Sequence, residues 1–316
     1  MTRRLALLAL FLACTTWVGA ATATSQRPIY RSGVDVVTVD VSVRNADKPV
    51  AGLTAADFEV LDNGVPQVFE LLNGSASGSA GAGSAGNASR GDAMVALPID
   101  VTLLLDVSNS VEGGMLERLK LSVRETAALI GPNDRLRLVV MQETLREIFP
   151  WQPGGAMPKV DTLMAQGATA FYDGLVAAMI RPGEPGRRQL IVALSDAKDT
   201  LSILDGETAR EIALHSDAVL HVVIPIVPKP GSKGIAQYAG DPLVGDLVAR
   251  TGGQIFPILI NDSIADAFKQ AIGDFRTSYV LRYTPTGVNR PGWHDITVKI
   301  KTGQYDVRAR KGYSGG

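Results

Sequence analysis

Apolar and polar residues alternate near the N-terminus of the chain. Every second residue from 37 to 43 is valine and the residues between them are polar, which is typical of a strand with one buried face. Further on, the dipeptide Asn63-Gly64 separates two β-prone runs and predicts a hairpin. We therefore expect an N-terminal β segment over residues 30–72.

Between residues 97 and 275 the pattern changes to apolar runs separated by longer amphipathic stretches. Four runs are almost continuously apolar and predict buried strands: PIDVTLLLD, RLRLVVMQ, QLIVALSD and AVLHVVIPIV. Apolar residues recur at helical spacing from Met115 to Ile130, and Gly131-Pro132 ends that helix. Further helices are predicted over residues 171–180, 208–216, 242–250 and 263–275. Strand–helix alternation of this kind predicts an α/β fold with a doubly wound, mainly parallel Rossmann-like sheet.

Alternation with a period of two returns over residues 278–313, where Tyr279, Leu281 and Tyr283 share one face of a predicted strand. This segment and the N-terminal one have about 40 residues each, too few for a core of their own. We predict that the two pair into one small β-sandwich-like domain. The α/β domain would then be inserted between them.

Residues 73–92 separate the N-terminal β segment from the α/β part. They read NGSASGSAGAGSAGNASRGD and contain almost no residues that could form a core. A segment rich in glycine, serine and alanine is typical of a flexible linker.

The first 23 residues have the pattern of an export signal. Arg3 and Arg4 precede an apolar stretch over residues 5–13, and Ala21-Thr22-Ala23 provides a cleavage site of the A-x-A type. The apolar stretch is short for a membrane anchor. We expect a signal peptide over residues 1–23 and an exported chain that is periplasmic, attached to the cell surface or secreted.

Cys14 is the only cysteine and lies inside this signal. Cleavage after Ala23 would leave a mature chain without thiols or disulfides. In an alternative interpretation, the sequence FLAC resembles a bacterial lipobox, and Cys14 would then carry a lipid anchor. No other stretch reaches roughly 18 uninterrupted apolar residues, so we expect no transmembrane segment in the mature chain.

Charge and motif content exclude several functional classes. With 31 basic and 32 acidic residues the formal net charge is −1, which argues against a nucleic-acid partner. The nucleophile elbow G-x-S-x-G and the phosphate-binding loop are missing, and no G-x-G-x-x-G precedes a predicted helix. The three histidines, His215, His221 and His294, lack ligand spacing and are expected to be structural. We predict that the protein is not an enzyme.

Acidic and hydroxyl side chains gather where predicted strands end. Asp106, Ser108 and Ser110 follow the first buried strand, Asp196 ends another, and Thr169 precedes a predicted helix. Ligands of open parallel sheets bind at the carboxyl ends of the strands. Oxygen ligands without histidine or cysteine suit Mg²⁺, Mn²⁺ or Ca²⁺. In the alternative interpretation, Ser108 or Ser110 merely caps the next helix.

Three elements in this order resemble the metal-ion-dependent adhesion site (MIDAS) of von Willebrand factor type A (VWA) domains. They read DVSNS from residue 106, GAT from residue 167 and SD from residue 195, and the resemblance covers residues 97–275. It implies that Ser108, Ser110 and Thr169 contact a divalent cation through hydroxyls. Asp106 and Asp196 would bind the cation directly or through water.

One position departs from the VWA pattern. Ala197 follows the second aspartate, where the family usually carries glycine. A methyl group there limits the backbone conformation, which bears on metal affinity. Nearby, Asp199 is expected to cap or solvate its loop and not to bind metal, and Asp173 is expected to be a carboxylate at the start of a helix.

The flanking segments resemble those of an exported bacterial group, the VWFA-related family of acidobacteria. The stretches that carry this resemblance are VDVVTVDVSVRN, PVAGLTAADFEVLDNGVPQVFEL, SYVLRYTP, WHDITVKI and DVRARKGY. The resemblance implies a non-enzymatic, metal-dependent protein-binding module of adhesion type, whose metal takes an Asp or Glu of an unknown protein ligand. Two alternatives remain open, a metal-independent docking component of an envelope complex and a metal-dependent hydrolase.

Overall fold

The computed structural model describes residues 36–46, 48–73, 97–226, 242–289 and 291–315. These residues belong to one compact unit. The predicted signal peptide, residues 1–23, lies outside the described residues, as does the predicted linker after Asn73.

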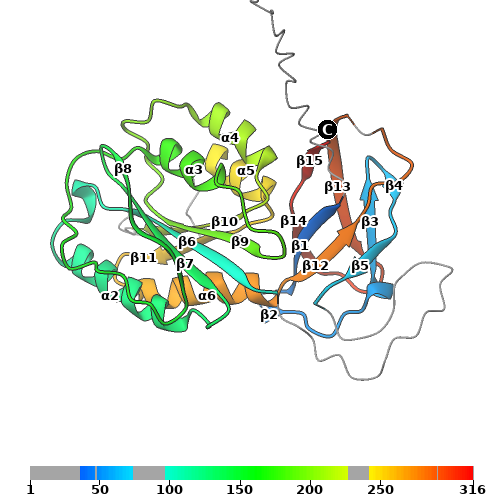
Figure 1. Cartoon of the computed structure of the whole chain (residues 1–316), viewed down its shortest axis with the longest axis horizontal. Coiled ribbons are helices and arrows are strands. Elements are labelled where there is room, and N and C mark those ends of the chain that lie inside the picture. Colours follow the sequence, from blue (N-terminus) through cyan, green and yellow to red (C-terminus); the bar gives the residue numbers. More distant parts are fainter. Residues whose placement is uncertain (1–35, 47, 74–96, 227–241, 290, 316) are drawn as a thin grey trace, which may run out of the picture. The chain divides into compact units, whose positions relative to one another are not determined.

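A six-stranded sheet forms the centre of the α/β part (Figure 1), with the order β11-β10-β9-β6-β7-β8. Its strands are β6 (Ile99–Asp106), β7 (Arg135–Met141), β8 (Leu145–Pro153), β9 (Arg188–Leu194), β10 (Val219–Ile226) and β11 (Ile255–Leu259). All neighbouring strands are parallel except the edge pair β7 and β8. The chain winds outward from β6 in one direction and then from β9 in the other, so the strand order reverses between them. The predicted doubly wound, mainly parallel sheet is confirmed.

Helices cover both faces of this sheet. The helices are α2 (Gly114–Leu129), α3 (Phe171–Met179), α4 (Gly206–His215), α5 (Pro242–Arg250) and α6 (Ile264–Thr277). Leu103 and Leu105 of β6 share a buried cluster with α2 and α6, whereas Leu104 shares the other cluster with α3, α4 and α5. Burial on both faces explains why β6 is apolar without alternation. Within the described ranges, none of these helices is long and apolar enough to cross a membrane.

The edges of the sheet and the helix ends depart from the sequence prediction. The edge strands β8 and β11 were not among the four predicted strands. Strand β8 mixes charged and apolar residues, and the short apolar run of β11 contains Pro257 at its centre. Helix α4 begins at Gly206, earlier than predicted, since the Asp205 carboxylate accepts a hydrogen bond from the Thr208 amide at 2.8 Å. Helix α6 extends to Thr277, past the predicted end at residue 275.

Strands from both ends of the described chain form a β sandwich of two sheets. One sheet has the order β14-β1-β12-β5 with β2 on the side of β1, and the other has the order β15-β13-β3-β4. The N-terminal strands are β1 (Val37–Asn45), β2 (Lys48–Pro49), β3 (Phe58–Asp62), β4 (Val65–Pro66) and β5 (Phe69–Leu71). The C-terminal strands are β12 (Tyr279–Tyr283), β13 (Gly292–Ile300), β14 (Asp306–Ala309) and β15 (Gly312–Gly315).

The two sheets of the sandwich each mix N-terminal and C-terminal strands. Strand β1 pairs with β12 and β14, and β3 pairs with β13, always antiparallel. One buried cluster joins both sheets, with Val39, Phe58 and Leu281 among its members. The predicted turn at Asn63-Gly64 joins β3 to β4, and both residues have positive φ (47° and 80°). The expected insertion of the α/β fold into a sandwich made from both segments is confirmed.

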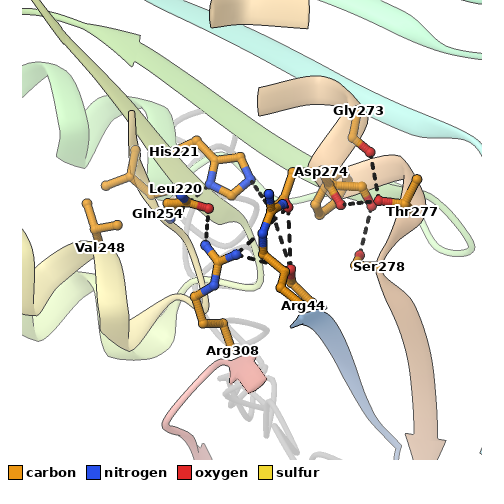
Figure 2. A network of polar contacts seen from close by, with 12 residues as sticks. Arg44, Leu220, His221, Val248, Gln254, Gly273, Asp274, Thr277, Ser278 and Arg308 are labelled. Atoms are coloured by element: carbon orange, nitrogen blue, oxygen red, sulfur yellow. Dashed lines mark hydrogen bonds and ion pairs between the residues drawn. The ribbon is translucent and has the colours of Figure 1, made fainter. Parts of the chain in front are cut away.

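Buried ionic contacts join the sandwich to the α/β part, as Figure 2 shows. Asp274 of α6 forms an ion pair with Arg44 of β1, and Arg308 of β14 lies 3.8 Å from the same carboxylate. The imidazole of His221 on β10 is fully enclosed, with Nε2 3.9 Å from Asp274. Burial, reinforced by the charge of Arg308, lowers the pKa of His221 to about 3, so this histidine is neutral.

Candidate metal-binding site

Asp106 is the centre of the site. It ends β6 at the reversal of strand order, and its side chain is buried. Its carboxylate accepts hydrogen bonds from the Ser108 amide at 3.0 Å and from the Ser195 hydroxyl at 2.8 Å. The Thr169 hydroxyl lies 3.3 Å from both carboxylate oxygens. Three segments that are distant in the sequence therefore converge on one carboxylate at the position where such sheets bind ligands.

Ser108 and Ser110 place two hydroxyls next to each other. Their Oγ atoms are 3.0 Å apart, Ser108 buried and Ser110 exposed. They flank the start of a short 3-10 turn, η2 (Asn109–Val111), which has no side-chain capping bond, and α2 begins beyond Gly113. The alternative that these serines cap the next helix is therefore wrong.

Backbone hydrogen bonds hold Thr169 against Asp106. The Thr169 amide donates to the Thr200 hydroxyl at 2.9 Å, and the Thr169 carbonyl accepts from the amides of Thr200 and Leu201 at 3.0 and 3.2 Å. On the other side, the Asn109 amide donates to the carbonyl of Gly167 at 3.1 Å. Gly167 has a φ of +72°, and a Cβ there would lie 2.6 Å from the Glu143 side chain, so this position requires glycine.

Asp196 adjoins this group through its neighbour Ser195. Its half-buried carboxylate accepts a hydrogen bond from the Lys198 amide at 3.1 Å and pairs with the Lys198 ammonium at 2.9 Å. The structure thus brings Asp106, Ser108, Ser110 and Thr169 together by hydrogen bonds. It places Asp196 at the end of the adjacent strand with Lys198 on its carboxylate.

Ala197 adopts the backbone conformation that favours glycine. Its φ is +60° and its side chain is buried. A left-handed conformation costs an alanine about 1 kcal/mol or more. The Ala197 amide donates to the Ser195 hydroxyl at 3.0 Å, which helps to hold the turn. The chain therefore keeps the turn expected for glycine at this position and tolerates the methyl group.

Two further aspartates fasten the loop between β9 and α4. The Asp199 carboxylate accepts from the Phe171 amide at 2.8 Å at the start of α3, which confirms the capping interpretation. The Asp173 carboxylate accepts from the amides of Ile203 and Leu204 at 3.0 Å each. Asp173 therefore ties α3 to this loop, a role that its helix position alone did not indicate.

Ser195 is the functional residue that sequence reasoning missed. Ser195 belongs to the SD motif of the family resemblance, but only Asp196 of that motif was among the predicted ligands. Its buried hydroxyl donates to Asp106 and accepts from the amide of Ala197, so it orients both the carboxylate and the turn. Its position beside Asp196 at the end of a predicted strand was the feature of the sequence that could have indicated this role.

The donor set fits a hard divalent cation. All five predicted ligands offer oxygen, which Mg²⁺ and Ca²⁺ prefer. An octahedron with metal–oxygen bonds of about 2.1 Å places neighbouring ligand oxygens about 3.0 Å apart, and the Oγ atoms of Ser108 and Ser110 have that separation. The described part of the chain contains no group of three or more His, Cys, Asp and Glu that could hold a metal. A cation here would depend on hydroxyl ligands.

A second buried polar cluster lies in the sandwich, away from this site. Asp62 of β3 accepts hydrogen bonds from the hydroxyls of Tyr283 and Tyr313 at 3.1 and 2.7 Å, and His294 Nδ1 lies 2.7 Å from its other oxygen. Burial and the nearby Asp62 raise the pKa of both tyrosines, which keeps their hydroxyls protonated as donors. The expectation that His294 is structural fits this arrangement.

A cleft of about 760 Å³ lies between β1, the start of β9 and the end of the described chain. Four arginines line it, Arg187, Arg188, Arg282 and Arg310, and each pairs with a carboxylate at 2.6 or 2.7 Å. Because these cations are already neutralised within the fold, the cleft does not offer a ready anion site.

Comparisons with known proteins identify similar folds among solved structures. No family model matches the chain, and no curated protein matches it. A von Willebrand factor type A structure from Catenulispora acidiphila is 11% identical, with a TM-score of 0.47, covering 68% of this chain and 66% of that one.

Two further solved structures are similar. The ArnB paralog VWA2 from Sulfolobus acidocaldarius is 10% identical, with a TM-score of 0.45, covering 88% of this chain and 76% of that one. An aerotolerance-related membrane protein from Bacteroides fragilis is 17% identical, with a TM-score of 0.41, covering 56% and 98%. Membership of the exported acidobacterial group stays a prediction.

Proposed function

We propose that this chain is a non-enzymatic, divalent-metal-dependent protein-binding module of an exported bacterial protein. The cation would be Mg²⁺, or Mn²⁺ or Ca²⁺, at Asp106, Ser108, Ser110, Thr169 and Asp196. The observation that carries the proposal is the pair of adjacent hydroxyls of Ser108 and Ser110 beside the buried Asp106.

The number of protein ligands leaves one coordination position of the cation open. Mg²⁺ takes six oxygens, and the chain offers three hydroxyls and two carboxylates. Hydroxyls add no negative charge, so the bound cation would attract a carboxylate from a partner protein. Ser110 is exposed, which gives a partner access to the site from solvent.

The surrounding residues hold the ligands in place. Ser195 fixes one oxygen of Asp106, and the Ser108 amide holds the other. The amides of residues 200 and 201 clamp the Thr169 carbonyl. Lys198 neutralises Asp196 in the absence of a cation, so we expect cation binding to displace the ammonium from that carboxylate.

The positions of the histidines support a non-catalytic role. His221 is buried in the contact between β10 and α6, and His294 is buried beside Asp62 in the sandwich. His215 ends α4. A metal-dependent hydrolase would need a general base within hydrogen-bond reach of its nucleophile, and neither buried imidazole lies in the group around Asp106.

The proposal is tested by calorimetric titration of the purified protein with Mg²⁺ and with Mn²⁺. We expect saturable binding that Asp106→Ala abolishes. Asp161→Ala is the matched control, because Asp161 is an exposed carboxylate paired with Arg124 on α2. Equal binding by the wild type and the Asp106→Ala variant would contradict the site. A folded protein that binds neither cation would favour the metal-independent docking role.

A further inference from the structure

Three large apolar side chains are exposed on the loops that carry the candidate site. Met164 is 68% exposed, Leu201 47% and Ile203 93%. Single exposed apolar residues are ordinary in proteins. These three differ from other exposed apolar residues because they lie on the two loops that also carry Thr169 and Asp196.

The backbones of these two loops lie on both flanks of the site. Gln142 donates to the carbonyls of Met164 and Val107 at 2.8 and 3.3 Å, and the Gln166 amide donates to Val107 at 3.0 Å. Met164 therefore lies beside the segment of Ser108. On the other flank, the amide of Leu201 is bonded to the carbonyl of Thr169 itself.

The loop that carries Leu201 and Ile203 is fixed by its backbone. The amides of Ile203 and Leu204 are bonded to Asp173 of α3, and the Ser202 amide is bonded to Asp199 at 3.3 Å. A backbone that is held in place before binding loses little conformational entropy when a partner covers the loop. Ile203 is thus an exposed apolar residue on an ordered backbone, a property of residues that anchor an interface.

Charge on the same loop favours an acidic ligand. Lys198 is exposed to 79% and lies beside Asp196. A cation at the proposed site would add positive charge next to this ammonium, and the two charges together would favour an incoming carboxylate. Apolar and positively charged groups therefore adjoin the position where a partner would bind.

We propose that the partner segment is an extended loop with an Asp or Glu flanked by large apolar residues. The carboxylate takes the open position of the metal, and the apolar neighbours pack on Leu201 and Ile203 and on Met164. This inference rests on the proposed function and specifies the chemistry of its ligand.

The test is a selection of displayed random peptides that contain a fixed central aspartate. Immobilised wild-type protein is used in Mg²⁺ and again in EDTA. We expect peptides that bind only in Mg²⁺ and that are enriched in large apolar residues next to the aspartate. A peptide chosen this way should bind the Leu201→Ser, Ile203→Ser double variant about tenfold more weakly. Mg²⁺ titration of that variant should match the wild type.

The control is a double variant on the outer surface of α2, Leu121→Ser with Leu129→Ser, two exposed leucines on a helix that does not carry the site. Its peptide binding should equal that of the wild type. Mg²⁺-dependent peptides without apolar enrichment, or equal binding by both double variants, would overturn the inference and leave the proposed function standing. Mg²⁺ binding without any Mg²⁺-dependent peptide would also overturn it. Absence of Mg²⁺ binding would instead remove the proposed function.

Discussion

The hydroxyl of Ser195 donates a hydrogen bond of 2.8 Å to Oδ2 of Asp106, and both side chains are buried. This bond joins the ends of β9 and β6 at the reversal of strand order. It fixes the direction of the carboxylate around which the candidate site is built, in the way that outer residues orient metal ligands.

Replacing Ser195 with alanine should therefore weaken metal binding. Partners of metal ligands typically contribute about tenfold or more to affinity, so we expect Ser195→Ala to bind Mg²⁺ about tenfold more weakly by calorimetry. Loss of a donor to a buried carboxylate should also lower the free energy of unfolding by about 1–3 kcal/mol. Ser216→Ala is the control, because this buried serine bonds to the carbonyl of Met179, away from the site. Unchanged Mg²⁺ affinity in Ser195→Ala would show that Asp106 is oriented without it.

Substitutions of Ala197 should separate backbone strain from metal affinity. Because φ is +60°, Ala197→Gly relieves strain and adds chain entropy to the unfolded state, so we expect a change in unfolding free energy within about 1 kcal/mol. Ala197→Val should destabilise by about 2 kcal/mol or more, since a β-branched side chain is poorly tolerated at positive φ. Mg²⁺ affinity of the glycine variant should stay close to the wild-type value. A large gain in affinity would mean that the methyl group obstructs the site.

The buried His221 should make the protein sensitive to mild acid. Its pKa is about 3 in the folded state against about 6.5 in the unfolded chain, so protons bind the unfolded state more strongly between these values. Its contribution to stability is complete above pH 6.5. It is lost as the pH falls below 6.5, by up to about 1.4 kcal/mol per pH unit.

Urea unfolding at a series of pH values measures this effect. In the His221→Gln variant, the free energy of unfolding should change less between pH 6.5 and pH 5 than in the wild type. This holds whatever the effect of the substitution on stability at neutral pH. His215→Gln is the control, because His215 is exposed at the end of α4. If the unfolding free energy of the wild type and of His221→Gln fell equally steeply with pH, His221 would not be the cause of the acid sensitivity.

The cluster around Asp62 should stabilise the sandwich strongly. Asp62→Ala leaves the hydroxyls of Tyr283 and Tyr313 and the imidazole of His294 without their buried acceptor. We expect a loss of about 3 kcal/mol or more in the free energy of unfolding, measured by chemical denaturation. Asp295→Ala serves for comparison, since that exposed carboxylate bonds to Trp293 and should contribute less than about 1 kcal/mol. Similar losses in both variants would contradict this role.

Much of the fold could be predicted because local patterns reflect burial. Three consecutive leucines in β6 indicated a strand covered on both faces, and the structure places Leu104 opposite its two neighbours. Edge strand β8 could not be found this way. Its residues are mostly half-buried or exposed, and it contains two prolines, so no continuous apolar run marks it.

The proximity of the candidate ligands could be predicted, but not the contacts that hold them. Asp106, Ser108 and Ser110 are close in sequence, so their proximity followed from the turn. The bond from Ser195 to Asp106 depends on β9 lying next to β6, which the strand order decides and a local pattern does not record. The pairing of Asp62 with His294 was hidden for the same reason, since the two residues are 232 positions apart.

The interleaved strands of the sandwich also bear on how the chain folds. Strand β1 cannot acquire its partners β12 and β14 until the C-terminal strands have been synthesised, and closing so long a loop carries an entropy cost that rises with its length. Helix α6 runs into β12 with only Ser278 between them. Once the α/β part has folded, it fixes the start of β12 and shortens the loop that remains to be closed. We therefore expect the inserted domain to act as a template for assembly and the sandwich to be completed last.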